Sequence, residues 1–245
     1  MSSNLTLTAL NLTNKNMDTF ASTPIAKTAD TLLHKVFGWM CAGLVVSSLT
    51  AYVTAASPAA LNVILGNQAV FFGLIIVELA LVIGLTWAIR RISASTATLL
   101  FLLYSLVNGL TLSVIVLLYA DASLASTFLI AAGMFGITAV YGYATHRDLS
   151  RWGSILMMGL VGIILAGVVN IFLGNSGLDI IISAIGIIIF TALTAYDMQK
   201  IKAMGMMALD DESRSKQAIY GALMLYLDFI NIFLNLLRFT GRRRN

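Results

Sequence analysis

The chain has 245 residues, of which 59% are hydrophobic and 11% are charged, and its formal net charge is +4. Because soluble domains carry about 25% charged residues, this composition excludes an ordinary soluble protein and predicts an integral membrane protein. One cysteine and two histidines far apart in the sequence, His34 and His146, argue against a disulfide framework and against a zinc site. Binding of a hard cation by carboxylate and carbonyl oxygens stays open.

Residues 1–31 are rich in Ser, Thr and Asn and contain no apolar run, so we expect a disordered cytoplasmic tail and not a cleaved signal peptide. The chain then divides into apolar runs of about 20 residues, the length that a helix needs to cross a bilayer. The predicted spans are 33–56, 69–89, 96–119, 123–144, 153–173, 178–199 and 218–238. Mostly short loops join them, which predicts one all-α transmembrane domain of antiparallel neighbours, 32–240, before a basic C-terminal tail, 241–245.

The positive charges predict the orientation, because cytoplasmic loops of membrane proteins carry an excess of Lys and Arg. With the N-terminus inside, the cytoplasmic side would carry Lys15, Lys27, Lys35, Arg90, Arg91, Arg147, Arg151, Lys200, Lys202, Arg214 and Lys216. The loops on the other side, near 57–68, 120–122 and 174–177, carry no positive charge. We therefore expect a multi-pass protein with a cytoplasmic N-terminus.

The last segment leaves two alternatives open. If it spans the membrane, Arg238 and the arginines at 242–244 lie outside; if it is a re-entrant hairpin, they return inside. The segment has no Gly or Pro after Gly221 that would mark a hairpin turn, which favours a full span.

This last segment also carries a polar stripe. Asp228, Asn231 and Asn235 are spaced i, i+3 and i+7, which puts them on one face of a helix. The two asparagines could serve only to hydrogen-bond neighbouring helices. A carboxylate at membrane depth is costly unless it has a partner, a proton or water, so Asp228 is a candidate functional residue.

Asp197 is the second acid in an apolar segment, close to the predicted cytoplasmic boundary. At 1.5 Å per residue it lies about 5 Å from that boundary, whereas Asp228 lies about 15 Å deep. Asp197 could therefore be an interfacial carboxylate beside Lys200. The two aspartates could meet if one helix shifts or extends past the membrane surface, and the segment MGMMAL at 204–209 could prolong the sixth helix.

Glu78 is the third acid at membrane depth, in a run without other charges before Arg90. It needs a donor from another helix; the candidates include Asn108, Thr111 and Asn170, or an arginine that reaches inward. A structural role and a role in permeation are both open for it. The small residues Gly38, Ala42, Gly133, Gly136, Gly159, Gly162 and Gly186 are expected at close helix contacts.

Two facing carboxylates behave as a unit. Like charges within a few ångström do not both ionise cheaply, so the pair titrates together. A protonated pair can join two helices through a shared hydrogen bond, while an ionised pair repels or captures a cation. A facing Asp197 and Asp228 would thus form a pH switch and a possible Ca²⁺ site.

Four segments resemble the signatures of the Bax-inhibitor-motif transmembrane family: YGYATHRDLSRWG, GLVGIILAGVVNIF, FTALTAYDMQKIK and GALMLYLDFINIFLNLLRF. The resemblance covers about 33–240 and implies a seven-helix fold in which two three-helix layers surround a central C-terminal helix. It also implies a hydrogen-bonded aspartate pair on the sixth and seventh helices, matching Asp197 and Asp228. An acid in the second helix matches Glu78, and the DLS motif begins at Asp148.

The same resemblance implies function. Members of the family are similar to pH-sensitive Ca²⁺ leak channels, and a bacterial member binds and modulates a membrane-bound AAA protease. In the leak channels an arginine after the second helix latches the aspartate pair. An ungapped alignment on Glu78 and Trp87 puts Ile89 at that place and Arg90 one residue later, and one residue turns a helix by about 100°.

The favoured hypothesis is a pH-gated cation (Ca²⁺) leak in a bacterial inner membrane, with the lipid bilayer, Ca²⁺ and protons as partners. Its sensor would be Asp197 and Asp228, supported by Glu78, Arg90, Asn231, Asn235 and Asp148. The alternative is a modulator that binds a membrane-embedded protease or another membrane partner without conducting ions. We expect no cofactor and no nucleic-acid partner.

An intramembrane aspartyl protease is a remote alternative. Tyr196-Asp197 would supply its first element, but the second should read Gly-x-Gly-Asp, and positions 225–228 read Leu-Tyr-Leu-Asp. The bulky side chains would keep a substrate away from the backbone. We therefore expect that the protein is not an enzyme.

Overall fold

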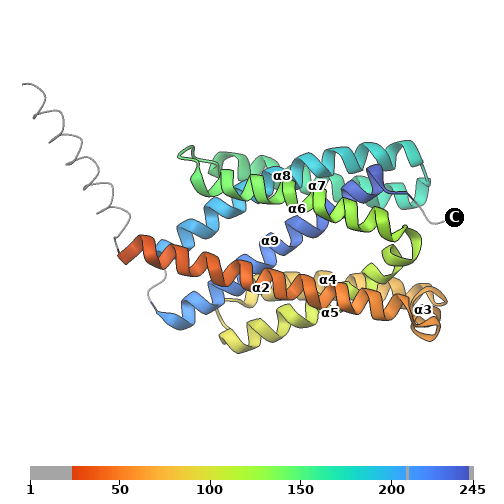
Figure 1. Ribbon diagram of the computed structural model, residues 1–245, viewed down its shortest axis with the longest axis horizontal. Helices are drawn as coiled ribbons and strands as arrows, with labels where there is room; N and C mark the ends of the chain where they lie inside the picture. Colours follow the sequence, from red (N-terminus) through yellow and green to blue (C-terminus); the bar gives the residue numbers. More distant parts are fainter. Residues whose placement is uncertain (1–23, 208–209, 243–245) are drawn as a thin grey trace, which may run out of the picture.

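Eight helices make up the part of the chain that the structure, a computed structural model, describes: residues 24–207 and 210–242 (Figure 1). They are α2 (Pro24–Ala55), α3 (Pro58–Leu65), α4 (Gln68–Ala88), α5 (Ala94–Leu118), α6 (Asp121–Ala144), α7 (Ser150–Leu173), α8 (Ser176–Met207) and α9 (Asp211–Thr240). Seven of them, all except α3, are long and apolar enough to cross a membrane. The prediction of an all-α protein with seven spans is confirmed.

The helix bounds differ from the prediction at three places. α2 begins at Pro24, so residues 24–31 of the expected tail are helical, while residues 1–23 and 243–245 lie outside the described residues. α3 occupies the predicted loop near 57–68; it begins after Ser57, whose side chain accepts a hydrogen bond from the Ala60 amide at 3.4 Å. α8 continues to Met207, as the segment at 204–209 allowed, and α9 already begins at Asp211.

α9 is a single uninterrupted helix. At 1.5 Å per residue its 30 residues measure about 45 Å, enough to cross a bilayer with its headgroup regions. A re-entrant hairpin would need a turn, and α9 has none between Asp211 and Thr240. The structure thus agrees with a full span for the last segment.

α9 lies between two groups of helices. On one side α5 packs against α2 and α4, and on the other α8 packs against α6 and α7. α9 contacts α2 and α5 of the first group and α6 and α8 of the second, and Figure 1 shows it crossing obliquely between them. In the most apolar stretch of α9, 67% of the residues are buried, compared with 6% in α4 and in α7. α9 is therefore the central helix of the bundle.

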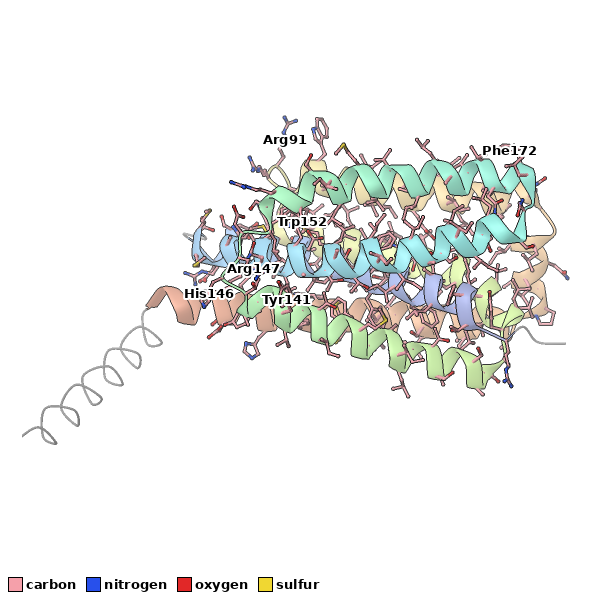
Figure 2. All side chains as sticks on the ribbon, turned by 90° about the horizontal axis from the view of Figure 1, so that it is seen from above. Arg91, Tyr141, His146, Arg147, Trp152 and Phe172 are labelled. Atoms are coloured by element: carbon pink, nitrogen blue, oxygen red, sulfur yellow. The ribbon has the colours of Figure 1, made fainter. Side chains whose placement is uncertain are left out.

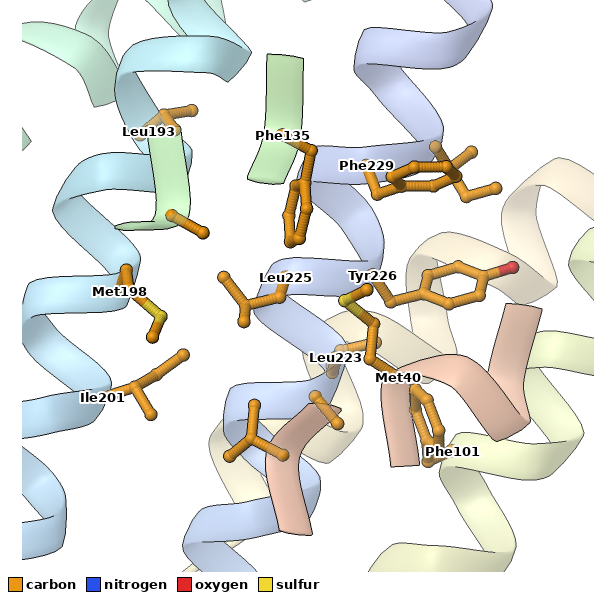
Figure 3. Packing of buried hydrophobic residues seen from close by; sticks show 14 of the residues in the cluster. Met40, Phe101, Phe135, Leu193, Met198, Ile201, Leu223, Leu225, Tyr226 and Phe229 are labelled. Atoms are coloured by element: carbon orange, nitrogen blue, oxygen red, sulfur yellow. The ribbon is translucent and has the colours of Figure 1, made fainter. Parts of the chain in front are cut away.

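Aromatic side chains fill the core on both sides of α9 (Figure 3). Tyr226 meets the rings of Phe101 and Tyr104 of α5 edge to face, with centroids 6.0 and 5.6 Å apart. One turn further, Phe229 meets Phe135 of α6 at 5.7 Å. Such edge-to-face pairs add to the burial of apolar area, so the two contacts anchor α9 to both groups.

The two ends and the sides of the bundle differ in chemistry (Figure 2). Arg91, His146 and Arg147 lie at one end, which we call the basic end, and Phe172 lies at the other. Large apolar side chains are exposed along the sides, among them Ile83 at 67% and Phe172 at 86%. A soluble protein rarely exposes so much apolar surface, so these sides suit contact with lipid chains.

Some glycines bring helices together, but mostly not those expected. Gly142 of α6 lies against the backbone of Ala195 in α8, and Gly186 of α8 lies against the Asn235 side chain, where a Cβ would come within 2.7 Å. By contrast, a Cβ added at Gly133, Gly136, Gly162 or Gly38 would meet no neighbouring atom within 4 Å. The expectation that these four glycines mediate close helix contacts is wrong.

Candidate functional site

Asp228 lies in the middle of α9, at the centre of the bundle. It is only 4% exposed, and its Oδ2 atom is buried without a hydrogen-bond partner among the described residues. A buried carboxylate oxygen without a donor is costly. The side chain therefore needs a proton, a cation or water to complete its contacts.

Asp197 of α8 lies next to it. The two carboxyl groups are close enough to interact electrostatically, and the Thr194 hydroxyl, one turn before Asp197, contacts the Asp228 carboxyl. Asp197 itself is half-buried and also interacts with Lys200. No hydrogen bond joins the two carboxyl groups within the described part of the chain, so the pair is adjacent but not clasped.

The predicted difference in depth does not keep the two aspartates apart. The predicted difference in depth assumed that the sixth span ends at 199 and the seventh begins at 218. In the structure both helices continue beyond these limits, to Met207 and from Asp211, and α9 runs obliquely between the two groups of helices (Figure 1). Asp197 is therefore an inward-facing neighbour of Asp228 in addition to lying near Lys200.

The pair offers oxygen ligands to a cation, but few of them. Two carboxylates and the Thr194 hydroxyl fall short of the six to eight oxygen atoms that surround Ca²⁺, so water would supply the rest. In the described residues no group of three or more His, Cys, Asp or Glu side chains could hold a metal ion. This arrangement suits a hydrated ion that passes better than one that is held tightly.

Asn231 and Asn235 continue the polar face of α9 away from the basic end. Their side-chain amides donate to carbonyl groups of their own helix, to Leu227 at 2.8 Å and to Asn231 at 2.7 Å. The side-chain NH₂ groups therefore form hydrogen bonds within α9 and do not join α9 to another helix. Together with Arg238 they line a cavity of about 180 Å³ between α7, α8 and α9.

A wider cleft of about 660 Å³ adjoins this cavity. The two share Gly167, Ile182 and Arg238, and the cleft adds the polar side chains of Asn170 and Asp179. Polar groups thus continue from the middle of α9 to the end of the bundle opposite the basic end.

Glu78 of α4 is half-buried and has two of the expected donors. Thr111 donates to its Oε1 at 2.6 Å and Asn108 to its Oε2 at 3.3 Å, both from α5. Asn170 lies elsewhere, in the cleft just described. The sequence-based reasoning missed Tyr226, whose hydroxyl donates to Asn108 Oδ1 at 2.8 Å; a tyrosine two residues before Asp228 was the available signal.

The structure does not bring Arg90 to the aspartate pair. Arg90 is exposed just beyond the end of α4 and lines an open surface cleft with Trp87. It forms no ion pair with Asp197 or Asp228 among the described residues. In this conformation none of the arginines that the structure describes latches the pair.

Asp148 lies in the exposed loop between α6 and α7. Its Oδ1 accepts a hydrogen bond from the Ser150 amide at 2.9 Å, and this bond holds the pKa of the Asp148 carboxyl below its usual value. Gln199 of α8, two residues after Asp197, fixes the same loop: it accepts from the Leu149 amide and donates to the Arg147 carbonyl, each at 2.9 Å. Asp148 thus shapes the start of α7, and Gln199 is a residue that the sequence did not single out.

Comparison with known proteins places the chain in a family. The family described as "Inhibitor of apoptosis-promoting Bax1" matches residues 29–245. The chain is 48% identical over 216 residues to the inner membrane protein YbhL of Escherichia coli K12, covering 87% of this chain and 92% of that protein. It is also 48% identical over 214 residues to an uncharacterized protein of Borreliella burgdorferi, which covers 87% of this chain and 92% of that protein. To the uncharacterized protein RP147 of Rickettsia prowazekii it is 40% identical over 213 residues, which covers 86% of this chain and 89% of that protein. This protein belongs to the Bax inhibitor-1-like family of membrane proteins.

Proposed function

We propose that this protein is a pH-sensitive cation leak channel that passes Ca²⁺ and is gated by Asp197 and Asp228. The observation that carries this proposal is the Asp228 carboxyl, which is 4% exposed and has one oxygen without a hydrogen-bond partner beside a second carboxyl group. Because Asp228 belongs to α9 and α9 contacts both groups of helices, a change at this carboxyl acts on the centre of the bundle.

The expected direction of the pH response follows from electrostatics. With one shared proton, the two carboxyl groups can hydrogen-bond and hold α8 against α9. As the pH rises and that proton leaves, the like charges repel each other or take up a cation, which loosens the contact between the two helices. Ca²⁺ flux should therefore increase as the pH rises through the titration of the pair.

The polar groups beyond the pair support a route for the ion. The cavity at Asn231, Asn235 and Arg238 and the adjoining cleft at Asn170 and Asp179 bring water-accessible polar surface toward one side of Asp228. Opening then requires movement of α8 and α9 at the pair itself. Neither Glu78 nor Arg90 has to bind the ion in this scheme.

Ca²⁺ flux into liposomes that contain the purified full chain, measured with an enclosed Ca²⁺ dye at several pH values, tests the proposal. Asp197→Asn and Asp228→Asn should each abolish or displace the pH dependence. Asp211→Asn serves as the matched control, because Asp211 is an exposed aspartate at the start of α9. If both variants of the pair titrate like the parent, the aspartates are not the sensor.

The membrane that holds this protein and the orientation of the chain in it are part of the same proposal. The relative YbhL is described as an inner membrane protein, and we assign this chain to the bacterial inner membrane as well. The basic end, with Arg91 and Arg147, would face the cytoplasm, and the N-terminus would lie on that side. Protease protection of an N-terminal tag in inverted vesicles checks the orientation. We further propose that the chain has no enzymatic activity.

A second candidate function is that of a modulator of a membrane-bound AAA protease. The loop between α6 and α7 favours it, because Gln199 holds this loop in place while His146, Arg147 and Asp148 remain exposed at the basic end (Figure 2). Copurification of such a protease in mild detergent, lost when these three residues are replaced by alanine, would support this function. The absence of Ca²⁺ flux in liposomes would then separate it from the leak channel.

A further inference from the structure

Among the described residues, Glu78 has no cationic partner. The described residues contain Lys or Arg ion pairs with carboxylates only at the start of α9, namely Arg214–Asp211 and Lys216–Glu212. α4 packs against α3, which has no ionisable side chain, and against α5 and α9. The titratable groups that interact with Glu78 from these two helices are the phenols of Tyr104 and Tyr226. If Glu78 were ionised, its charge would be uncompensated at membrane depth.

The contacts of Glu78 form a chain of hydrogen bonds with a backbone carbonyl group at each end. In the short arm, Glu78 Oε1 lies 2.6 Å from Thr111 Oγ1, which lies 2.9 Å from the carbonyl oxygen of Asn108. A threonine hydroxyl has one hydrogen. When Glu78 is ionised, that hydrogen can fill only one of the two contacts, because both the carboxylate and the carbonyl are acceptors.

The long arm runs through α9 to α2. Glu78 Oε2 contacts Asn108 at 3.3 Å, Asn108 contacts the Tyr226 hydroxyl at 2.8 Å, and that hydroxyl lies 2.6 Å from Ser47 Oγ. Ser47 Oγ in turn lies 2.6 Å from the carbonyl oxygen of Ser105. Asn108, Tyr226 and Ser47 contribute one hydrogen each to this arm, so one contact again lacks a hydrogen when Glu78 is ionised.

A proton on the Glu78 carboxyl group supplies the hydrogen that is missing from one of the two arms. If it sits on Oε1, Glu78 donates to Thr111, and Thr111 donates to the Asn108 carbonyl, so the short arm is complete. If it sits on Oε2 and the Asn108 amide is turned by 180°, every donor of the long arm points from Glu78 toward Ser105, and that arm is complete instead. Both arrangements keep the observed heavy-atom positions.

We infer that Glu78 is a proton-binding site separate from the aspartate pair, built by Thr111 and Asn108 and completed by Tyr226 and Ser47. Its ligand is a single proton, and when this proton sits on Oε2 it sets the direction in which the hydroxyl groups of Tyr226 in α9 and Ser47 in α2 donate. Because Tyr226 lies two residues before Asp228, this site acts on the same central helix as the pair. The inference concerns protonation only and does not depend on ion conduction.

The sequence allows a direct test, because it contains two glutamates, Glu78 and Glu212. The full chain is labelled with ¹³C-glutamate, reconstituted in lipid nanodiscs, and studied at neutral pH by ¹³C NMR and by infrared spectroscopy. Glu212 is exposed at the start of α9 and serves as the internal reference for an ionised glutamate. We expect one protonated and one ionised carboxyl signal, with the protonated signal lost in Glu78→Gln and the ionised one in Glu212→Gln.

A pair of threonine variants then tests the network. Thr111→Val should shift the infrared C=O band of the protonated Glu78, since the hydroxyl that contacts it is removed. Thr98→Val, on the same helix but with its hydroxyl bonded to the Ala94 carbonyl at 2.9 Å, should leave that band unchanged. Two ionised glutamates at neutral pH in the parent protein would overturn the inference. This result does not depend on the folding of Glu78→Gln, because Glu212→Gln is sufficient to assign both signals.

Discussion

The backbone of Gly142 in α6 lies directly against the backbone of Ala195 in α8: a Cβ added at Gly142 would come within 2.8 Å of the Ala195 Cα atom. Ala195 is two residues before Asp197, so this contact determines how closely α6 approaches the part of α8 that carries the candidate sensor. Real Cβ atoms do not approach other atoms so closely, so only glycine fits without a shift of the helices.

Gly142→Ala should therefore destabilise the protein. Overpacking of a close helix contact costs about 1–3 kcal/mol, because the backbone of Ala195 is not free to rotate away as a side-chain tip would be. Thermal unfolding in detergent should show a lower midpoint. Gly136→Ala, on the same helix but with nothing within 4 Å of its added Cβ, is the control and should leave the midpoint unchanged or raise it slightly. Equal midpoints for the two variants would show that the α6–α8 contact is not tight.

Tyr226→Phe should destabilise the protein without changing its shape. The variant keeps the ring that packs against Phe101 and Tyr104 but loses the hydroxyl contacts with Ser47 and Asn108. An unsatisfied buried polar group costs about 1–3 kcal/mol, so the unfolding midpoint should fall. Tyr220→Phe is the control, since Tyr220 is half-buried and its ring, which lies 5.5 Å from the Lys200 ammonium, is retained. A similar midpoint for both variants would contradict a structural role for the Tyr226 hydroxyl.

The first turn of α9 should open at acid pH. The Asp210 carboxyl accepts a hydrogen bond from the Ser213 amide at 2.6 Å, and this bond holds the pKa of Asp210 below its usual value. A carboxyl whose pKa is lower in the folded state stabilises that state above the ordinary aspartate pKa, and this contribution is lost as the pH falls through the folded-state value. Nuclear magnetic resonance of the Ser213 amide should therefore show a change at low pH that is absent in Asp210→Asn, which caps the helix without titrating. An amide signal that titrates equally in both proteins would argue against the cap.

The spans could be predicted because their cause is local. Each contains about 20 consecutive apolar residues, and a helix is the form in which an isolated segment satisfies its backbone in lipid. α3 was missed because its eight residues are too few for a span and follow Ser57 and Pro58, which are typical of a loop as well as of a helix start. The predicted sixth span ends too early, just before Lys200, and the predicted seventh begins too late, just after Lys216, because charged residues form helices readily outside the membrane.

The site depended on contacts between distant segments, and these could be predicted only in part. Asn108 and Thr111 were recognised as donors for Glu78 because their chemical types and membrane depth suit an acid. Tyr226 and Gln199 were not recognised, since a tyrosine in an apolar helix and a glutamine beside a lysine have no distinctive pattern. The glycines show the same limit: Gly142 and Gly136 are equivalent in sequence, and only the position of α8 distinguishes them.

Gln199→Leu should release the loop between α6 and α7. Gln199 makes two hydrogen bonds with this loop, to the Leu149 amide and to the Arg147 carbonyl, and leucine replaces neither while keeping a similar size. Hydrogen exchange of the Leu149 amide should accelerate about 5- to 150-fold, the range that corresponds to about 1–3 kcal/mol for a lost hydrogen bond. Gln68→Leu, at the exposed first position of α4, is the matched control and should leave this exchange unchanged. Because Gln199 lies two residues after Asp197, the same variant tests whether the loop takes part in gating: if the loop opens while the pH dependence of Ca²⁺ flux stays that of the parent, the loop is not a component of the gate.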